Sequence, residues 1–364
     1  MKRFGKQWSA LLGGVALVAT LVGCTQRAEI SQLSLSPLPS IVEDEAYGCG
    51  LGSASCPVID GELVLAGGAN FPFTPQDFTT QKRYYNQIWA LDEAGGVWQQ
   101  VGEVPYPVAY AGNFALGNRL IVAGGSATGT TYQSVFSLSL NEGKAHCEMM
   151  PELPYPLEQA GAAWSGERLY LAGGLTAPGK TAGDVLVCDL ANGGEWRVLT
   201  TIPEPMVQPI LAASERYLYL WAGFDPVAKR SSSNGYRLDL ATLTWTPCAP
   251  VPEEGTFVGA TAFPADEEGL MVVGGVNRTN FNKGLVATGE ALTEYLLMEA
   301  EEHNFNRKIW RFSFAEEAWR AMGEFKECAL AAPAAARHEN RLFVFSGEVK
   351  ARVRTPLNWV IEME

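Results

Sequence analysis

The most regular feature of the chain is a short apolar run that follows a polar turn and ends in two small residues. Six such runs occur, at residues 63–68, 120–125, 169–174, 218–223, 270–275 and 342–347. Their second-to-last residues are 57, 49, 49, 52 and 72 positions apart. A period near fifty predicts a fold built from six copies of one structural unit.

Each unit carries the same further signals. A turn such as Gly117-Asn118 precedes the apolar run, and a second strand-like segment such as residues 185–190 follows it. A tryptophan and a proline then mark the end, as in Trp196 and Pro203. Short strands separated by turns predict one antiparallel four-stranded sheet for each unit. The chain is therefore predicted to be all-β.

The paired glycines, the later tryptophan or tyrosine and the spacing resemble kelch repeats, which implies a six-bladed kelch-type β-propeller. The sixth unit stops after its third strand, at residues 358–363, and residues 32–39 have the composition of a fourth strand followed by a proline. We expect this N-terminal strand to close the last blade, which would leave no long free edge. The propeller is then predicted to span residues 25–364.

The fifth unit carries an insertion at about residues 285–303. Leu292, Tyr295, Leu296 and Glu299 fall on one helical face, and Thr288 is suited to cap the start. Two interpretations stay open: a helix over the mouth of the ring, and a solvated decoration at its rim.

The first 24 residues have the pattern of a bacterial lipoprotein signal. Lys2, Arg3 and Lys6 precede an apolar run at residues 11–22, which ends just before Cys24. The run is short for a membrane span. We therefore expect export, cleavage before Cys24 and a lipid on that thiol. The protein would be a periplasmic or cell-surface lipoprotein whose membrane contact is the lipid anchor.

Charge excludes one class of partner. The formal net charge is -13, and cleavage before Cys24 would remove three cations and no acid, which leaves -16. Such a chain is unsuited to nucleic acid, because binding depends on neutralising phosphates. An anion-binding site would have to be a local cluster of cations. The sequence leaves open whether the chain forms a homodimer.

Cysteine and histidine usage argues against a metal centre. Cys49 and Cys56 form the one close pair, and the sequence leaves open whether they are bridged. The chain has three histidines and no Cys-x-x-Cys pair. We expect no metal and no other cofactor. A copper radical oxidase would need histidine ligands at the mouth, where His303 is the one candidate.

In a four-stranded blade, the loop after the second strand and the exit from the fourth strand open on the same face. The polar and aromatic residues of these loops suit a sugar, which offers apolar ring faces and many hydroxyls. The candidate substrate-binding residues on this face are Asn70, Arg83, Tyr110, Gln159, Gln208, Asn277 and Arg278. Each of them, taken alone, is also an ordinary loop residue.

The loop after the last apolar run combines a carboxylate with three cations. Residues 347–355 (GEVKARVRT) resemble the Gly-Glu-x-Lys-x-Gly-x-Arg-Thr loop of the N-acetylneuraminate mutarotases, also called epimerases, which are kelch propellers. Residues 274–281 and 304–308 also resemble that family's pattern. The loop lies near the C-terminus here and mid-chain in the ordinary family, so the blade order resembles that of the cyclically permuted relatives.

The resemblance implies that Glu348 is the catalytic carboxylate and Arg354 its partner. Arg352 stands where the family motif has glycine, so a positive φ would be strained there. The implied reaction interconverts the anomers of a sialic acid or related acidic sugar. One carboxylate can accept and return the proton of the anomeric hydroxyl, and an arginine can hold the sugar carboxylate.

Two alternatives remain beside this function. Without the resemblance, Glu348 and Arg354 would be interpreted as a structural ion pair of the loop. A kelch propeller is also a common binding scaffold, so the chain could capture a glycan or a protein without turning it over.

Overall fold

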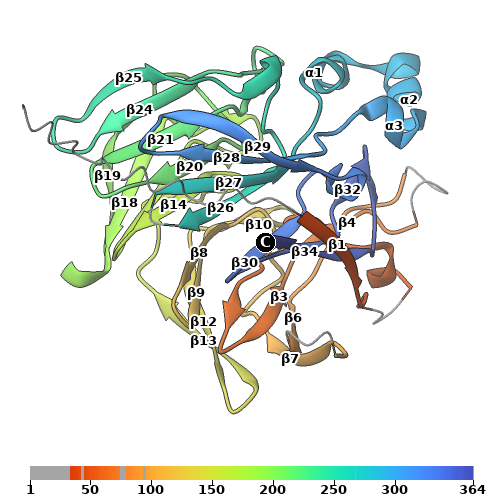
Figure 1. The fold of residues 1–364 in the computed structure, drawn as a ribbon, viewed down its shortest axis with the longest axis horizontal. Helices are drawn as coiled ribbons and strands as arrows, with labels where there is room; N and C mark the ends of the chain where they lie inside the picture. Colours follow the sequence, from red (N-terminus) through yellow and green to blue (C-terminus); the bar gives the residue numbers. More distant parts are fainter. Residues whose placement is uncertain (1–32, 42–44, 74–78, 93–95, 267, 364) are drawn as a thin grey trace, which may run out of the picture.

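The computed structural model describes residues 33–41, 45–73, 79–92, 96–266 and 268–363. The predicted signal peptide and Cys24 lie outside these residues. In the described part of the chain, six four-stranded antiparallel sheets surround a central channel, each with its first strand innermost (Figure 1). This arrangement is a six-bladed β-propeller, as predicted.

The first three blades follow each other without interruption. Blade 1 consists of β2 (Val58–Ile59), β3 (Glu62–Ala66), β6 (Gln87–Asp92) and β7 (Gln99–Glu103). Blade 2 consists of β8 (Gly112–Leu116), β9 (Arg119–Ala123), β12 (Val135–Asn141) and β13 (Lys144–Met150). Blade 3 consists of β14 (Gly161–Ser165), β15 (Arg168–Ala172), β18 (Asp184–Asp189) and β19 (Trp196–Thr201).

The other three blades complete the ring. Blade 4 consists of β20 (Ile210–Ala213), β21 (Tyr217–Trp221), β24 (Gly235–Asp239) and β25 (Thr244–Cys248). Blade 5 consists of β26 (Ala260–Asp266), β27 (Gly269–Gly274), β28 (Lys308–Ser313) and β29 (Ala318–Glu324). Blade 6 consists of β30 (Ala334–His338), β31 (Arg341–Phe345), β34 (Asn358–Met363) and β1 (Leu33–Leu38).

The ring closes as the sequence predicts. The N-terminal strand β1 pairs antiparallel with the C-terminal strand β34, from Leu33 opposite Met363 to Leu38 opposite Asn358. The interface between blades 6 and 1 is filled by aromatic side chains, with the rings of Trp98 and Phe345 5.4 Å apart. The first and last strands of the propeller are therefore hydrogen-bonded to each other in one blade.

In five blades, the paired small residues join the blade to the exit of its fourth strand through a backbone hydrogen bond. In blade 2, the Gly125 amide donates to the Leu157 carbonyl at 2.8 Å. Gly124 has φ +67°, and a Cβ there would lie 2.2 Å from the same carbonyl oxygen. Glycine is required because the exit backbone passes against it. The exits and the paired-glycine loops therefore share one face, which we call the mouth face.

The loops between the second and third strands form short hairpins on the mouth face in five blades. They are β4 (Ala69–Asn70) with β5 (Arg83–Tyr84), β10 (Ser126–Ala127) with β11 (Thr130–Thr131), β16 (Leu175–Ala177) with β17 (Lys180–Thr181), β22 (Phe224–Asp225) with β23 (Arg230–Ser231), and β32 (Glu348–Lys350) with β33 (Val353–Arg354).

Blade 5 carries helices in place of the hairpin. They are α1 (Arg278–Val286), α2 (Gly289–Leu297) and α3 (Ala300–His303). The helical region starts earlier than the predicted residue 285, because Asn277 caps α1 by accepting from the Asn280 amide at 3.0 Å. Thr288 lies at the start of α2, as predicted, without a capping hydrogen bond from its side chain. The three helices stand together beside β32 (Figure 1).

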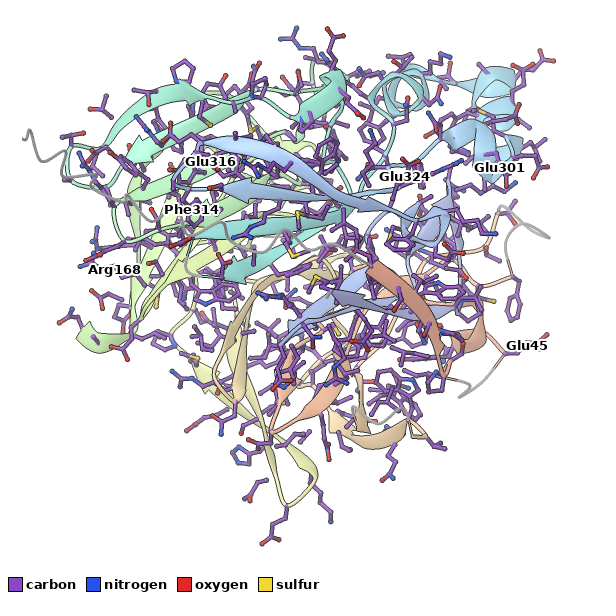
Figure 2. All side chains as sticks on the ribbon, in the orientation of Figure 1. Glu45, Arg168, Glu301, Phe314, Glu316 and Glu324 are labelled. Atoms are coloured by element: carbon purple, nitrogen blue, oxygen red, sulfur yellow. The ribbon has the colours of Figure 1, made fainter. Side chains whose placement is uncertain are left out.

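The exterior is polar in the ordinary way. The exposed charged side chains of Glu45, Arg168 and Glu301 lie at the periphery (Figure 2). No helix of the described chain has the length and apolar character needed to cross a membrane. Cys49 and Cys56 are unbridged thiols.

Candidate active site

Glu348 and Arg354 face each other across the hairpin of blade 6. They are register partners in β32 and β33, and Arg354 Nη1 lies 2.5 Å from Glu348 Oε2. The Arg354 side chain is 4% exposed and the Glu348 side chain 21%. The pair named from the sequence is therefore assembled, with a buried cation and a carboxylate that solvent can reach.

Backbone hydrogen bonds hold this hairpin against the ring. Glu348 exchanges both backbone bonds with Ala331, at 2.7 and 2.8 Å. The Gly347 amide donates to the Leu51 carbonyl at 2.8 Å, and the Thr355 amide donates to the Gly347 carbonyl at 2.9 Å. The carboxylate and the guanidinium thus stand on a strand pair that is fixed at its base.

Arg352 adopts the conformation that the motif glycine would adopt. Its φ is +65°, as the comparison with the motif predicts, and it lies in the turn between Lys350 and Val353. For a residue with a side chain this backbone conformation costs on the order of 1 kcal/mol. The guanidinium of Arg352 lies 5.3 Å from the centre of the Phe71 ring, so the strained residue contributes a cation to the mouth.

Phe71, in the β4–β5 loop of blade 1, is the point on which several cations converge. Arg354 lies 5.2 Å from the centre of its ring, and Lys82 Nζ also lies 5.2 Å from it. Contacts of this kind between a cation and an aromatic face are attractive. The hairpins of blades 1 and 6 therefore form one cluster, although the sequence separates them by almost the whole chain.

Buried donor capacity remains on Arg354. Its contact with Glu348 is close but poorly aligned for hydrogen bonding, so among the described residues Nε and Nη1 have no hydrogen-bond acceptor. Buried donors without acceptors are costly and uncommon. Such donors at a mouth are suited to an anionic ligand.

A polar network crosses the neighbouring part of the mouth face. Ser126 Oγ donates to Glu158 Oε2 at 2.6 Å, and Gln159 Nε2 donates to the same oxygen at 3.3 Å. Gln208 Nε2 donates to Gln159 Oε1 at 2.6 Å. Two of the predicted binding residues, Gln159 and Gln208, are therefore linked to each other and to a carboxylate that the sequence did not single out.

The channel entrance is ringed by one residue from each blade, all with positive φ. The six residues are Ser53, Tyr110, Gln159, Gln208, Gly259 and Ala332. Backbone hydrogen bonds run between successive members, such as Gln159 N to Tyr110 O and Gln208 N to Gln159 O, both at 2.9 Å. These residues line a cavity of about 460 Å³ that extends to His338 at the far end. The Glu348–Arg354 pair stands beside this rim and does not line the cavity.

Two predicted residues of blade 1 have other surroundings. Asn70 is fully buried, and its amide donates to the carbonyls of Ala46 and Gly50 at 2.8 and 2.9 Å. Arg83 lies over the Tyr85 ring. Because neighbouring residues of an extended chain face opposite sides, Lys82 faces away from Arg83, and its Nζ lies 5.2 Å from the Phe71 ring centre and 5.9 Å from that of Tyr84. Lys82 was not among the residues predicted from the sequence. The alternation of residues 82–85 was the available signal, because it places Lys82 and Arg83 on opposite sides of the extended chain.

Asn277 and Arg278 belong to the helical insertion. The Asn277 side chain serves as the cap of α1. Arg278 Nη1 donates to the Glu254 carbonyl and Ser233 Oγ at 3.3 and 3.4 Å. Arg278 lines a separate cleft of about 220 Å³ between α1 and β23. The structure therefore does not bring these two residues to the Glu348 cluster.

The helical insertion does contact the Glu348 hairpin. Lys350 Nζ donates to the Met298 carbonyl at 2.9 Å and lies 3.8 Å from Glu299. Burial raises the pKa of Tyr295 to about 12, with the Glu348 charge adding to the effect. Burial, with Lys350 second, lowers the pKa of His303. The insertion therefore supports the mouth and is more than a decoration.

The chain is similar to known proteins in sequence and in fold. A family model described as N-acetylneuraminate epimerase matches residues 150–364, which is more than half of the chain. The chain belongs to the N-acetylneuraminate epimerase family.

Members of the N-acetylneuraminate epimerase family are similar over part of their length. The epimerase of Pasteurella multocida (strain Pm70) is 32% identical over 183 residues, which are 46% of this chain and 48% of that protein. The epimerase of Yersinia pestis (strain Pestoides F) is 24% identical over 184 residues, which are 46% of this chain and 47% of that protein. The chain thus matches about half the length of these curated relatives.

A solved structure supports the fold. The structure of YjhT superposes with a TM-score of 0.61 over 89% of this chain and 95% of that one, at 14% sequence identity. At that identity the likeness concerns the propeller architecture.

Proposed function

We propose that this chain interconverts the anomers of N-acetylneuraminate or a closely related acidic sugar. The observation that carries the proposal is the Glu348–Arg354 pair on the mouth-face hairpin, at 2.5 Å, in a chain of the N-acetylneuraminate epimerase family. The name of the family's relatives supplies the substrate class. The cations gathered at Phe71 and the cavity beside them are suited to a small anionic sugar.

The proposed reaction opens and recloses the sugar ring, and proton transfer is the catalysis that it needs. Glu348 accepts the proton of the anomeric hydroxyl, the bond from the anomeric carbon to the ring oxygen breaks, and Glu348 delivers the proton to that oxygen, which becomes a free hydroxyl. The open form is a ketone. After rotation about the bond to the ketone carbon, the hydroxyl attacks the other face of the ketone. Glu348 accepts the proton of this hydroxyl and delivers it to the former ketone oxygen. Bonds and protons balance, so no oxidant, metal or second substrate is consumed.

Arg354 has two roles in this proposal. It holds the Glu348 carboxylate in a fixed orientation, because it is buried and paired with it across the hairpin. Its guanidinium shares the Phe71 ring with Arg352 and Lys82, and a sugar carboxylate bound at these cations would be held by charge-assisted contacts. In N-acetylneuraminate the carboxylate and the anomeric hydroxyl are on the same carbon, so a base and a cation must stand side by side.

The experiment is anomeric exchange of N-acetylneuraminate followed by NMR, with the uncatalysed rate subtracted. The purified protein should accelerate exchange, and Glu348→Gln should remove most of the acceleration while it keeps the fold. A protein that binds the sugar and leaves the exchange rate unchanged is a binding propeller, and the enzymatic proposal is then lost. A variant as fast as the wild type shows that another group carries the proton.

We also propose that the protein is an exported lipoprotein anchored at Cys24. The proposal rests on the basic start, the apolar run and the cysteine described above. Metabolic labelling with a radioactive fatty acid should mark the wild-type protein and leave Cys24→Ser unmarked. Equal labelling of both would exclude this attachment site.

A further inference from the structure

Lys82 stands at the centre of the aromatic cluster of the mouth. Its Nζ lies 5.2 Å from the centre of the Phe71 ring, 4.7 Å from that of Tyr110 and 5.9 Å from that of Tyr84. It donates one hydrogen bond, at 2.9 Å, to the Tyr110 hydroxyl. An ammonium group has three donors, so the lysine is held in place with donor capacity to spare.

The charge of Lys82 has no counterpart in the described part of the chain. Other cations there have carboxylate partners, such as Lys308 with Glu253 and Arg311 with Asp266. Lys82 has a neutral phenol as its hydrogen-bond partner, although acidic residues outnumber basic ones by 40 to 27 in the sequence. A half-buried cation without an anion is a costly arrangement unless a ligand supplies the charge.

A second cation contacts the same ring. Lys82 and Arg354 come from the hairpins of blades 1 and 6, and each lies 5.2 Å from the centre of the Phe71 ring. Their mutual repulsion is relieved by an anion bound between them. Glu348, on the same hairpin as Arg354, is 2.5 Å from the guanidinium, so such an anion would be next to the proposed proton acceptor.

We propose that Lys82 binds the carboxylate of the sugar acid together with Arg354. This inference rests on the function proposed above and names a binding residue for it. The carboxylate lies between the ammonium and the guanidinium, over the edge of Phe71. The anomeric hydroxyl on the same carbon is then directed toward Glu348. Lys82 discriminates acidic sugars from neutral ones, whereas Glu348 transfers the proton.

The test compares Lys82→Met with Arg83→Met. Methionine keeps an apolar chain against Phe71 and removes the charge. Arg83 is the matched control, because it is the adjacent cation and lies over Tyr85 on the other side of the strand. For each protein, binding of N-acetylneuraminate and of its methyl ester is measured by titration calorimetry, and exchange is measured by NMR. The ester keeps the sugar and removes the negative charge.

The expected result is specific for charge. Wild type and Arg83→Met should bind the acid more tightly than the ester. Lys82→Met should lose this preference, because its affinity for the acid falls by roughly 10- to 100-fold, the effect of losing one hydrogen bond to a charged group. Its KM rises more than its kcat falls. Lys82→Arg restores part of the preference. Equal losses for acid and ester, or an unchanged acid affinity, would overturn the inference.

The two proposals fail in different ways. If wild type prefers the acid through Lys82 but does not accelerate exchange, the carboxylate site stands and the mutarotase function falls. If wild type accelerates exchange and Lys82→Met retains the acid preference, the function stands and Lys82 has no part in binding. A wild-type protein with no preference for the acid over the ester excludes the role of Lys82, whatever the exchange rate.

Discussion

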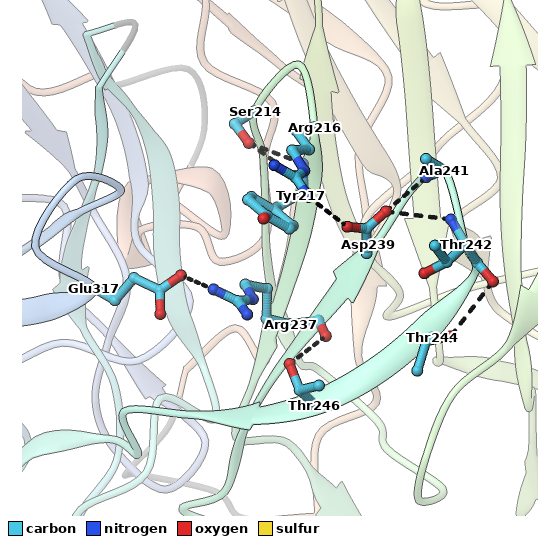
Figure 3. Close-up of polar contacts among 10 residues, drawn as sticks. All are labelled: Ser214, Arg216, Tyr217, Arg237, Asp239, Ala241, Thr242, Thr244, Thr246 and Glu317. Atoms are coloured by element: carbon cyan, nitrogen blue, oxygen red, sulfur yellow. Dashed lines mark hydrogen bonds and ion pairs between the residues drawn. The ribbon is translucent and has the colours of Figure 1, made fainter.

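Two of the close Glu–Arg pairs of the propeller have different surroundings. Glu348 and Arg354 face each other within one hairpin on the mouth face. Glu317 and Arg237 join two blades on the opposite face, since Glu317 lies in the turn before β29 and Arg237 lies in β24 (Figure 3). The residue types are the same, so the pair alone does not distinguish a functional site from a structural one.

The opposite-face pair is surrounded by matched partners. Glu317 also accepts from the Tyr219 hydroxyl at 3.4 Å. Arg237 lies 4.6 Å from the centre of the Tyr217 ring, and Arg216 covers the same ring at 4.9 Å. Arg216 is itself paired with Asp239 at 3.2 Å (Figure 3). Each charge in this group has an opposite charge nearby, which is typical of a structural tie.

The mouth pair lies beside a cation, Lys82, that has no carboxylate partner in the part of the chain that the structure describes. Arg354 has buried donors without acceptors among the described residues, and Lys82 approaches the same ring with a phenol as its partner. A cavity opens beside them. Surplus charge and vacant hydrogen-bonding capacity, more than the ion pair, therefore mark the place where a ligand belongs. Four measurements test whether this difference in surroundings separates a functional pair from a structural one.

The largest expected effect separates the two carboxylates by activity. Glu348→Gln should lower the catalysed exchange rate by roughly 10²- to 10⁴-fold, the usual contribution of a proton-transfer group. Glu317→Gln is the matched control and should leave the rate within about twofold of the wild type. NMR exchange measures both. Similar losses in the two variants would mean that the surroundings of the two pairs do not distinguish a functional carboxylate from a structural one.

The second effect is the pH dependence of stability that arises from His303, in the helical insertion beside the mouth. Burial lowers the pKa of His303 in the folded protein, so below about pH 6.5 the unfolded chain binds a proton that the folded chain does not. This part of the stability is present above that pH and is lost as the pH falls toward the lowered pKa. His303→Phe should therefore flatten the decline by up to about 1.4 kcal/mol per pH unit. Urea unfolding at pH 7.5 and 5.5 measures it, and parallel declines would contradict the assignment.

The third effect concerns backbone strain at the mouth. Arg352 has φ +65°, so Arg352→Gly should stabilise the fold by up to about 1 kcal/mol. Lys229, with φ +51° in the hairpin of blade 4, is the matched control, and Lys229→Gly should give a similar gain. Sugar binding should weaken in Arg352→Gly and stay unchanged in Lys229→Gly, because the first substitution also removes a cation that lies over Phe71. Thermal unfolding with and without the sugar distinguishes strain from charge.

The smallest effect tests the structural pair. A double-mutant cycle of Arg237→Met and Glu317→Gln should give a coupling of about 0.5–1 kcal/mol in unfolding free energy, since both side chains are partly exposed. No change in exchange rate should accompany it. A coupling of zero would mean that the two blades are held together by packing alone.

Much of the fold follows from the sequence by itself. The six paired-small-residue runs predict six blades, because only small residues admit the exit backbone that passes against them. The missing fourth strand of the last unit predicts that β1 pairs with β34. The Glu348 loop and the positive φ of Arg352 were also readable, because a motif records local backbone requirements.

Tertiary structure alone decided which neighbouring side chains share the mouth. Asn70 is held by buried carbonyls, and Arg278 lies in another cleft. Lys82, and not Arg83, meets Arg354 at Phe71. A one-residue difference along a strand reverses the facing of a side chain, and blades 1 and 6 meet only after the ring has closed. Local patterns determine which elements form, whereas the identity of a site depends on the packing between them.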